Sequence, residues 1–150
     1  AAAPVTRKSK GGKGGVLMSL PHTRAVVWGD PGNGLEVLRQ KLSDLGLEVH
    51  PVASFEDARA AIHSETVDLV VSWLGGGFVE PLELLTWLQT RPAAPPVLIV
   101  TAWPEVDLYL EAMRRGAFDC VGLPLDSHEL ARIVARALES RCARSVAEGG

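Results

Sequence analysis

Short apolar segments alternate with segments of helical periodicity along this chain, and this alternation limits the folds that it can adopt. Apolar runs bounded by turn residues are typical of buried strands. Apolar residues that recur every three or four positions indicate one face of a helix. We predict strands at 25–28, 47–52, 67–74, 97–101 and 118–122. A helical segment follows each strand, which predicts five strands and five helices in all.

Residues at the segment ends support this division. Gly46 stands where a glycine commonly ends a helix, and Ser54 with Asp57 has the spacing of an N-terminal capping box. Asp126 with Glu129 marks the start of the last helix in the same way. Strands joined by helices form parallel sheets through right-handed crossovers. We therefore expect an α/β, doubly wound fold: a five-stranded parallel sheet in the flavodoxin-like order 2-1-3-4-5, with five helices.

The composition is that of one globular domain. The 150 residues are 47% hydrophobic and 22% charged, as is usual for such domains. No apolar stretch is long enough to cross a bilayer, and residues 1–20 lack the apolar core of a secretory signal. Cys120 and Cys142 are too few for a disulfide framework and suit a reducing compartment. We expect a cytoplasmic protein.

The first 20 residues differ in charge from the rest of the chain. They contain Arg7, Lys8, Lys10 and Lys13 and no acidic residue, although the whole chain has a net charge of −3. Their glycine-rich sequence holds too few apolar groups to pack. Basic residues without aromatic neighbours are weak support for nucleic-acid binding, so no such partner is expected. We predict a disordered basic leader or added segment at 1–20, a folded domain at 21–142 and a flexible tail at 143–150.

Four segments that include the ends of predicted strands resemble the strands of a known family. They are Val-Val-Trp-Gly-Asp-Pro at 26–31, Asp-Leu-Val-Val-Ser-Trp-Leu at 68–74, Val-Leu-Ile-Val-Thr-Ala at 97–102 and Gly-Ala-Phe-Asp-Cys-Val-Gly-Leu-Pro at 116–124. Together they resemble the first, third, fourth and fifth strands of bacterial two-component response-regulator receiver domains. The resemblance covers about residues 24–141. It implies the same doubly wound fold and a role in signalling.

Receivers carry their chemistry at the carboxyl ends of the strands: acids that hold Mg²⁺, an aspartate that accepts a phosphoryl group, a hydroxyl and a lysine. The matching positions here are Trp28, Gly29, Asp30, Trp73, Thr101 and Leu123. Trp73 replaces the acceptor and has no nucleophilic oxygen, and Leu123 replaces the lysine. Mg²⁺ requires oxygen ligands, which the side chains of Trp28 and Gly29 lack. The resemblance therefore implies a degenerate receiver, or pseudo-receiver, without a phosphoacceptor, metal or cofactor.

Trp28, Trp73 and Trp103 all lie at or just beyond strand ends on the same predicted edge of the sheet. Each indole can bury on the order of 200 Å², so the rings could fill the vacated acidic pocket by apolar packing. Alternatively, they could line a cleft in which a planar ligand stacks. A one-residue shift in register would instead bring Ser72 to the acceptor position, because neighbouring strand residues face opposite sides.

Other chemical motifs are incomplete. Gly29 and Gly34 have the outer spacing of a phosphate-binding loop, but Leu35-Glu36 replaces the Lys-Ser/Thr that such a loop requires. The histidines at 22, 50, 63 and 128 lack zinc-ligand spacing. Cys120 stands where receivers often carry an aromatic switch residue, and we interpret it as a small buried strand residue. No acid–base pair or nucleophile triad is assembled, so we expect neither catalytic residues nor an enzyme.

The resemblance also implies a surface for protein contact, formed by the fourth helix, the fifth strand and the last helix. Candidate residues are Tyr109, Glu111, Arg115, Arg132 and Arg136, although a solvated face would carry the same charges. We predict a non-phosphorylatable signalling module that acts through a protein partner or a homodimer in a two-component or phosphorelay pathway. The alternative is a flavodoxin-like domain that binds a planar or nucleotide ligand at the tryptophan-lined edge. The partner's identity, the oligomeric state and the presence of an effector domain stay open.

Overall fold

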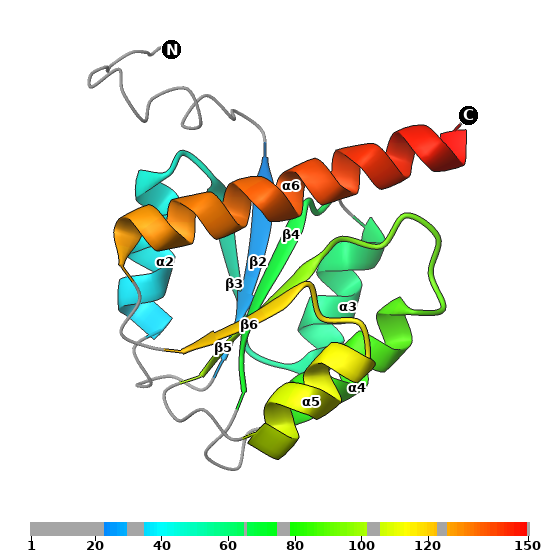
Figure 1. The fold of residues 1–150 in the computed structure, drawn as a ribbon, viewed down its shortest axis with the longest axis horizontal. Helices are drawn as coiled ribbons and strands as arrows, with labels where there is room; N and C mark the ends of the chain where they lie inside the picture. Colours follow the sequence, from blue (N-terminus) through cyan, green and yellow to red (C-terminus); the bar gives the residue numbers. More distant parts are fainter. Residues whose placement is uncertain are drawn as a thin grey trace.

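A five-stranded parallel sheet forms the centre of the protein (Figure 1). The computed structural model describes residues 23–29, 35–64, 66–74, 79–101, 106–122 and 126–149, with the backbone alone at 35 and 141–149. The strands are β2 (Arg24–Trp28), β3 (Glu48–Val52), β4 (Leu69–Trp73), β5 (Val97–Thr101) and β6 (Asp119–Gly122). Their order, β3-β2-β4-β5-β6, confirms the predicted topology. The basic leader expected at 1–20 lies outside the described residues.

β4 is the central strand, as the predicted order requires. It pairs with β2 on one side, where Trp28 is opposite Ser72, and with β5 on the other, where Trp73 is opposite Val100. Every residue of β4 and β5 is buried, because helices cover both faces of the sheet. β3 lies at an edge and contains Pro51, which is tolerated where one side of a strand has no neighbour.

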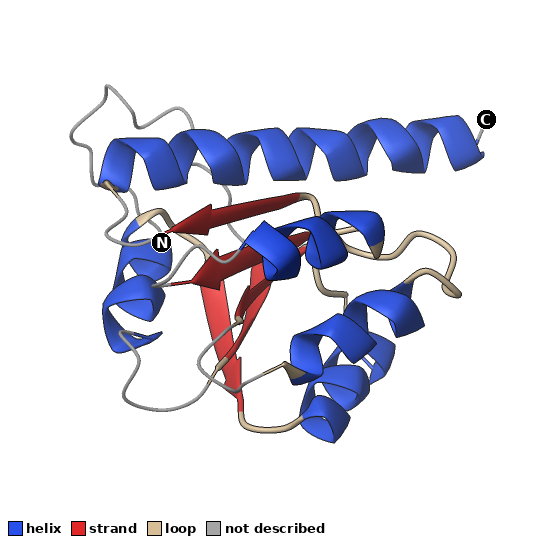
Figure 2. Cartoon of the chain, turned by 60° about the horizontal axis from the view of Figure 1, so that its bottom comes forward, coloured by secondary structure: helices blue, strands red, loops and turns tan. Residues whose placement is uncertain are grey.

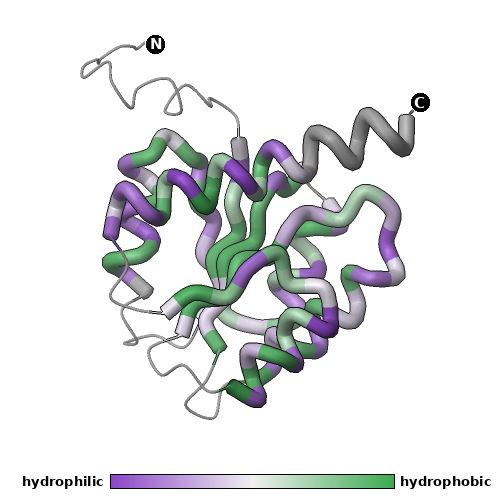
Figure 3. The backbone as a smooth tube through the Cα atoms, in the orientation of Figure 1, coloured by the Kyte–Doolittle hydropathy of each residue, from purple (hydrophilic) through white to green (hydrophobic). Residues whose placement is uncertain are grey.

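Helices cover the two faces of the sheet in two layers (Figure 2). The helices are α2 (Leu35–Asp44), α3 (Phe55–Ser64), α4 (Glu80–Leu88), α5 (Val106–Arg114) and α6 (Ser127–Gly149). α2 and α6 pack with Val27 and Val71 on one face, and α3, α4 and α5 pack with Val26 and Val70 on the other. The strands are apolar and the outer helix surfaces are largely hydrophilic (Figure 3). Neighbouring residues of one strand therefore belong to two separate cores, as period-two alternation requires.

Helix ends form at the residues that the sequence marked for them. Gly46 and Gly116 follow α2 and α5 with φ values of 95° and 103°, in the left-handed region that glycine enters without steric cost. The Ser54 hydroxyl accepts the backbone N–H of Asp57 at 3.0 Å at the start of α3. This bond satisfies an N–H group that has no partner within the first turn of the helix.

α6 is longer than predicted. It runs from Ser127 to Gly149, whereas we expected the domain to end at residue 142 and a flexible tail to follow. Residues 141–149 include Ala, Arg and Glu, which favour helix, with no proline and no glycine before Gly149. The helix therefore continues past the end of the sheet (Figure 1). Within the described part of the chain, no helix combines the length and apolarity that a membrane span needs.

Candidate functional site

Three strands end side by side at the carboxyl edge of the sheet, where ligands bind in doubly wound folds. β2 ends at Trp28, β4 at Trp73 and β5 at Thr101. The register joins them, because Trp28 is opposite Ser72 and Trp73 is opposite Val100. Gly29, directly after β2, is buried. The structure thus brings four of the six predicted site positions to one edge; the other two, Asp30 and Leu123, lie outside the described residues.

Trp28 belongs to the core beneath α3, α4 and α5. Its side chain is 1% exposed. The indole stacks on the ring of Phe55, at the start of α3, with centroids 6.0 Å apart and planes inclined by 10°. This offset arrangement adds to the burial energy of the two rings. Trp28, which the sequence resemblance places at the first acid of receivers, is therefore an apolar contact between β2 and α3.

Trp73 belongs to the opposite core, beneath α2 and α6. Its side chain is 6% exposed and packs in one cluster with Val27, Val100 and Leu130. The expectation that Trp28 and Trp73 fill or line one common pocket is therefore wrong. Trp28 is in register with Ser72, so Trp73 is one residue out of phase and faces the other side of the sheet. Trp103, the third ring of that hypothesis, lies outside the described residues.

The hydroxyl groups at this edge are buried. The Ser72 hydroxyl is fully buried and donates to the backbone carbonyl of Trp73 at 3.3 Å. Its side chain lies on the Trp28 side of the sheet, away from that of Trp73. Thr101 is 8% exposed at the end of β5. In the described parts of the chain, no three His, Cys, Asp or Glu residues gather as a metal site would require.

Comparison with known proteins assigns this arrangement to a family. The profile of the "Response regulator receiver domain" matches residues 29–135. The chain belongs to this receiver family. It is 34% identical over 123 residues to the C4-dicarboxylate transport transcriptional regulatory protein DctD of Pseudomonas aeruginosa, covering 80% of this chain and 26% of that protein. It is 31% identical over 117 residues to the DNA-binding transcriptional regulator NtrC of Salmonella typhimurium, covering 77% and 25%.

Solved structures agree with this assignment. NtrX from Brucella abortus is 27% identical with a TM-score of 0.71, covering 85% of this chain and 29% of that one. A CheY-like receiver domain protein from Methanospirillum hungatei has a TM-score of 0.68 at 22% identity, covering 79% and 95%, and shows the fold alone. The receiver described here spans about a quarter of the length of the curated relatives that it matches.

Cys120 lies on β6 and is half-buried. It stands at the position where receivers often carry an aromatic residue. Burial, together with the negative charge of Asp119, raises the pKa of the Cys120 thiol to about 11. The thiol is therefore protonated at neutral pH and is a poor nucleophile. Its position against the core beneath α3, α4 and α5 agrees with the packing role predicted for it.

The five predicted partner-face residues divide into two groups. Tyr109 on α5 is 42% exposed, and Arg132 and Arg136 on α6 are exposed. The Arg136 guanidinium lies 5.9 Å over the Phe118 ring, which partly fixes its direction. These three side chains are accessible to a partner. Glu111 and Arg115 instead take part in contacts within the receiver.

Glu111 and Arg115 belong to a network that we call the α4–α5 clasp. The Arg115 guanidinium lies 2.6 Å from the Glu111 carboxylate and donates to the Leu82 carbonyl at 3.1 Å and the Thr86 hydroxyl at 3.2 Å. In return, the Gln89 amide donates to the Arg115 backbone carbonyl at 2.8 Å. The hydrogen bond from Arg115, aided by the charges of Arg114 and Arg115 and opposed by burial, lowers the pKa of Glu111. The clasp therefore fixes α5 against α4.

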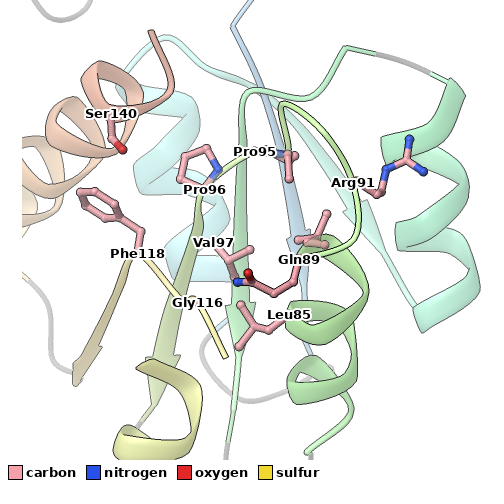
Figure 4. A pocket seen from close by; sticks show the side chains of 11 residues that line it. Leu85, Gln89, Arg91, Pro95, Pro96, Val97, Gly116, Phe118 and Ser140 are labelled. Carbon is pink, nitrogen blue, oxygen red and sulfur yellow. The ribbon is translucent and has the colours of Figure 1, made fainter. Parts of the chain in front are cut away.

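Sequence reasoning missed Gln89. It lies against Gly116, where a positive φ favours glycine and where an added side chain would displace the Gln89 amide. Gln89 also lines a pocket of about 130 Å³ near the starts of β5 and β6, with Pro96, Phe118 and Ser140 (Figure 4). This pocket lies at the amino end of the strands, away from Trp28 and Trp73. Gln89 and Arg115 are 26 positions apart. No sequence pattern connects them, so the sequence could not have revealed their contact.

Proposed function

We propose that this receiver signals through protein–protein contact and does not accept a phosphoryl group at the family's acceptor position. The observation that carries the proposal is Trp73 at the end of the central strand, 6% exposed and packed among aliphatic side chains. An indole provides no oxygen that could form an acyl phosphate. Only 6% of the Trp73 side chain is exposed to solvent.

The other members of the family constellation are replaced as well. Trp28 is an apolar contact to Phe55, and Gly29 has no side chain. Neither supplies the carboxylate oxygens that Mg²⁺ prefers. Leu123 stands in the sequence where the family carries a lysine that neutralises the phosphoryl charge. Only Asp30 and Thr101 keep residue types that the family uses. Because phosphoryl transfer depends on positioning and charge stabilisation, one carboxylate and one hydroxyl cannot support it without an acceptor.

The surface of α5 supports a contact function. Val106 is 70% exposed and Leu110 is 52% exposed, beside the 42% exposed Tyr109. Adjacent exposed apolar and aromatic residues mark interaction sites on protein surfaces. The α4–α5 clasp holds the helix that presents them, which reduces the ordering cost of binding. We propose that this surface receives the partner protein, together with Arg132 and Arg136 of α6 on the other side of the edge strand β6.

Exposure to acetyl phosphate or to beryllofluoride with Mg²⁺ tests the proposal. We expect the intact mass and the amide NMR spectrum of the receiver to stay unchanged. A receiver that carries the acceptor aspartate, treated in parallel, provides the positive control. A mass gain of one phosphate that hydroxylamine removes would contradict the proposal, because it would reveal an acyl phosphate on another carboxylate.

A receiver without a phosphoryl input is also expected to hold one dominant conformation, since no ligand binds one state in preference to another. Relaxation-dispersion NMR at the residues that follow Thr101 and Leu123 measures this directly. Microsecond–millisecond exchange that responds to a small molecule would contradict the proposal. Native mass spectrometry of the purified protein addresses the ligand-binding alternative, which a co-purified planar or nucleotide compound would support.

A further inference from the structure

Two guanidinium groups lie on one indole at the seam between α3 and α4. The Arg59 guanidinium is 5.6 Å from the centroid of the Trp87 ring, and that of Arg91 is 4.7 Å from it. Arg59 also lies 5.5 Å over Phe55. The indole therefore gathers two positive charges, and neither is in an ion pair among the residues described. We call this cluster the basic half of the surface.

Acidic residues precede this cluster on the same side of α4. Glu80, Glu83 and Trp87 follow one another at spacings of three and four, which places them along one helical stripe. Both glutamates are exposed, and neither is in an ion pair among the residues described. They form the acidic half of the surface, beside Val79, which is 45% exposed.

We propose that this α3–α4 surface binds a second copy of the same chain, with α4 packed antiparallel to α4 of the partner. A two-fold axis near the middle of α4 brings the acidic half of each copy against the basic half of the other. Glu80 then faces Arg91 of the second copy, and Glu83 faces Arg59. Glu80 begins α4 and Arg91 lies three residues beyond its end at Leu88, so the two halves lie toward opposite ends of the helix and both pairs of charges can meet in one register.

The charge pattern is what favours a second copy over an unrelated partner. Any partner must offer a basic patch and an acidic patch in matching order, and this chain carries that order itself. Such self-complementarity is the requirement of an isologous two-fold interface. Tryptophan and arginine are also the residues most enriched at the centres of interfaces.

Paired charge reversal tests this interface in the full chain. One double variant, Arg59→Glu with Arg91→Glu, makes both halves acidic, and a second, Glu80→Arg with Glu83→Arg, makes both halves basic. Sedimentation velocity is measured for the wild type, each variant and their equimolar mixture, over a concentration series up to the solubility limit. Glu36→Arg with Asp44→Arg, on α2 across the sheet, is the matched control for a change in net charge.

The wild type and the α2 control should self-associate, more weakly at high salt because exposed charges are screened. Each double variant alone should remain monomeric, whereas their mixture should form a one-to-one dimer, since every facing pair is again of opposite sign. Circular dichroism establishes that both variants fold. A wild type that stays monomeric throughout, variants that dimerise on their own, or folded variants that fail to associate when mixed would each overturn the proposal.

Discussion

The carboxyl edge of the sheet and the α4–α5 clasp are stabilised in opposite ways. At the edge, Trp28 and Trp73 are buried in two cores and contribute through apolar contact. At the clasp, Arg115 connects two helices through charged and neutral hydrogen bonds near the surface. The difference teaches that Trp28 and Trp73, at two positions where the sequence resemblance predicted acids, belong to the hydrophobic cores. The polar network that remains serves to join helices.

The largest effect is expected at the apolar edge. Trp73→Ala should lower the free energy of unfolding by about 3–5 kcal/mol, because it removes a large buried ring and leaves a cavity. Trp73→Asp should lower it at least as much, since a carboxylate without a cationic partner would be buried. Urea denaturation measures both, with Trp73→Phe as a milder control. A Trp73→Asp protein as stable as the wild type would mean that water reaches this position.

A smaller effect is expected at the clasp. Arg115→Ala should lower the free energy of unfolding by about 1–2 kcal/mol, because partly exposed hydrogen bonds to α4 are lost. Arg114→Ala is the matched control: it breaks a bond to the same glutamate from a side chain that is 73% exposed, which should change stability by about 0.5 kcal/mol or less. Hydrogen exchange of α5 amides should also accelerate in Arg115→Ala alone. Equal effects of the two substitutions would show that the bonds to α4 contribute nothing.

The smallest effect on stability at neutral pH is expected at Cys120 on β6. Its pKa is raised to about 11 in the folded protein from 9.0, so folding favours the protonated thiol. The resulting stability is fully present below pH 9.0 and is lost as pH rises toward about 11. Urea denaturation of wild type and Cys120→Ala, both in a Cys142→Ser background, should therefore differ in pH dependence only in this alkaline range. Divergence at neutral pH would show that the thiol ionises there.

The fold could be predicted from the sequence because its signals are local. Period-two and 3.6-residue patterns marked the strands and helices, and Ser54 and Gly46 marked helix ends. The strand order was predicted as the flavodoxin-like order of doubly wound folds, which the resemblance to receivers also implies and which right-handed crossovers permit. The helix α6 extends into the segment for which we expected a flexible tail, because no residue before Gly149 stops it. An exposed helix can continue wherever the helix propensity of its residues allows.

The site was only partly predictable. The sequence placed Trp28, Trp73 and Thr101 at one edge, since parallel strands end together. It did not reveal which face each ring occupies. That depends on the pairing of Trp28 with Ser72, a register between strands about 40 residues apart that no local pattern encodes. The clasp was missed for the same reason, because Gln89 and Arg115 meet only in the folded protein.

The clasp has a consequence for how this receiver can change over generations. Two of its acceptors, at Leu82 and Arg115, are backbone carbonyls, which every amino acid provides. Mutation of Leu82 to another residue therefore cannot delete the acceptor. The link between the helices therefore requires the donor side chains of Arg115 and Gln89 and the small size of Gly116. Related chains could thus diverge widely along α4 while inheriting the same attachment of α5.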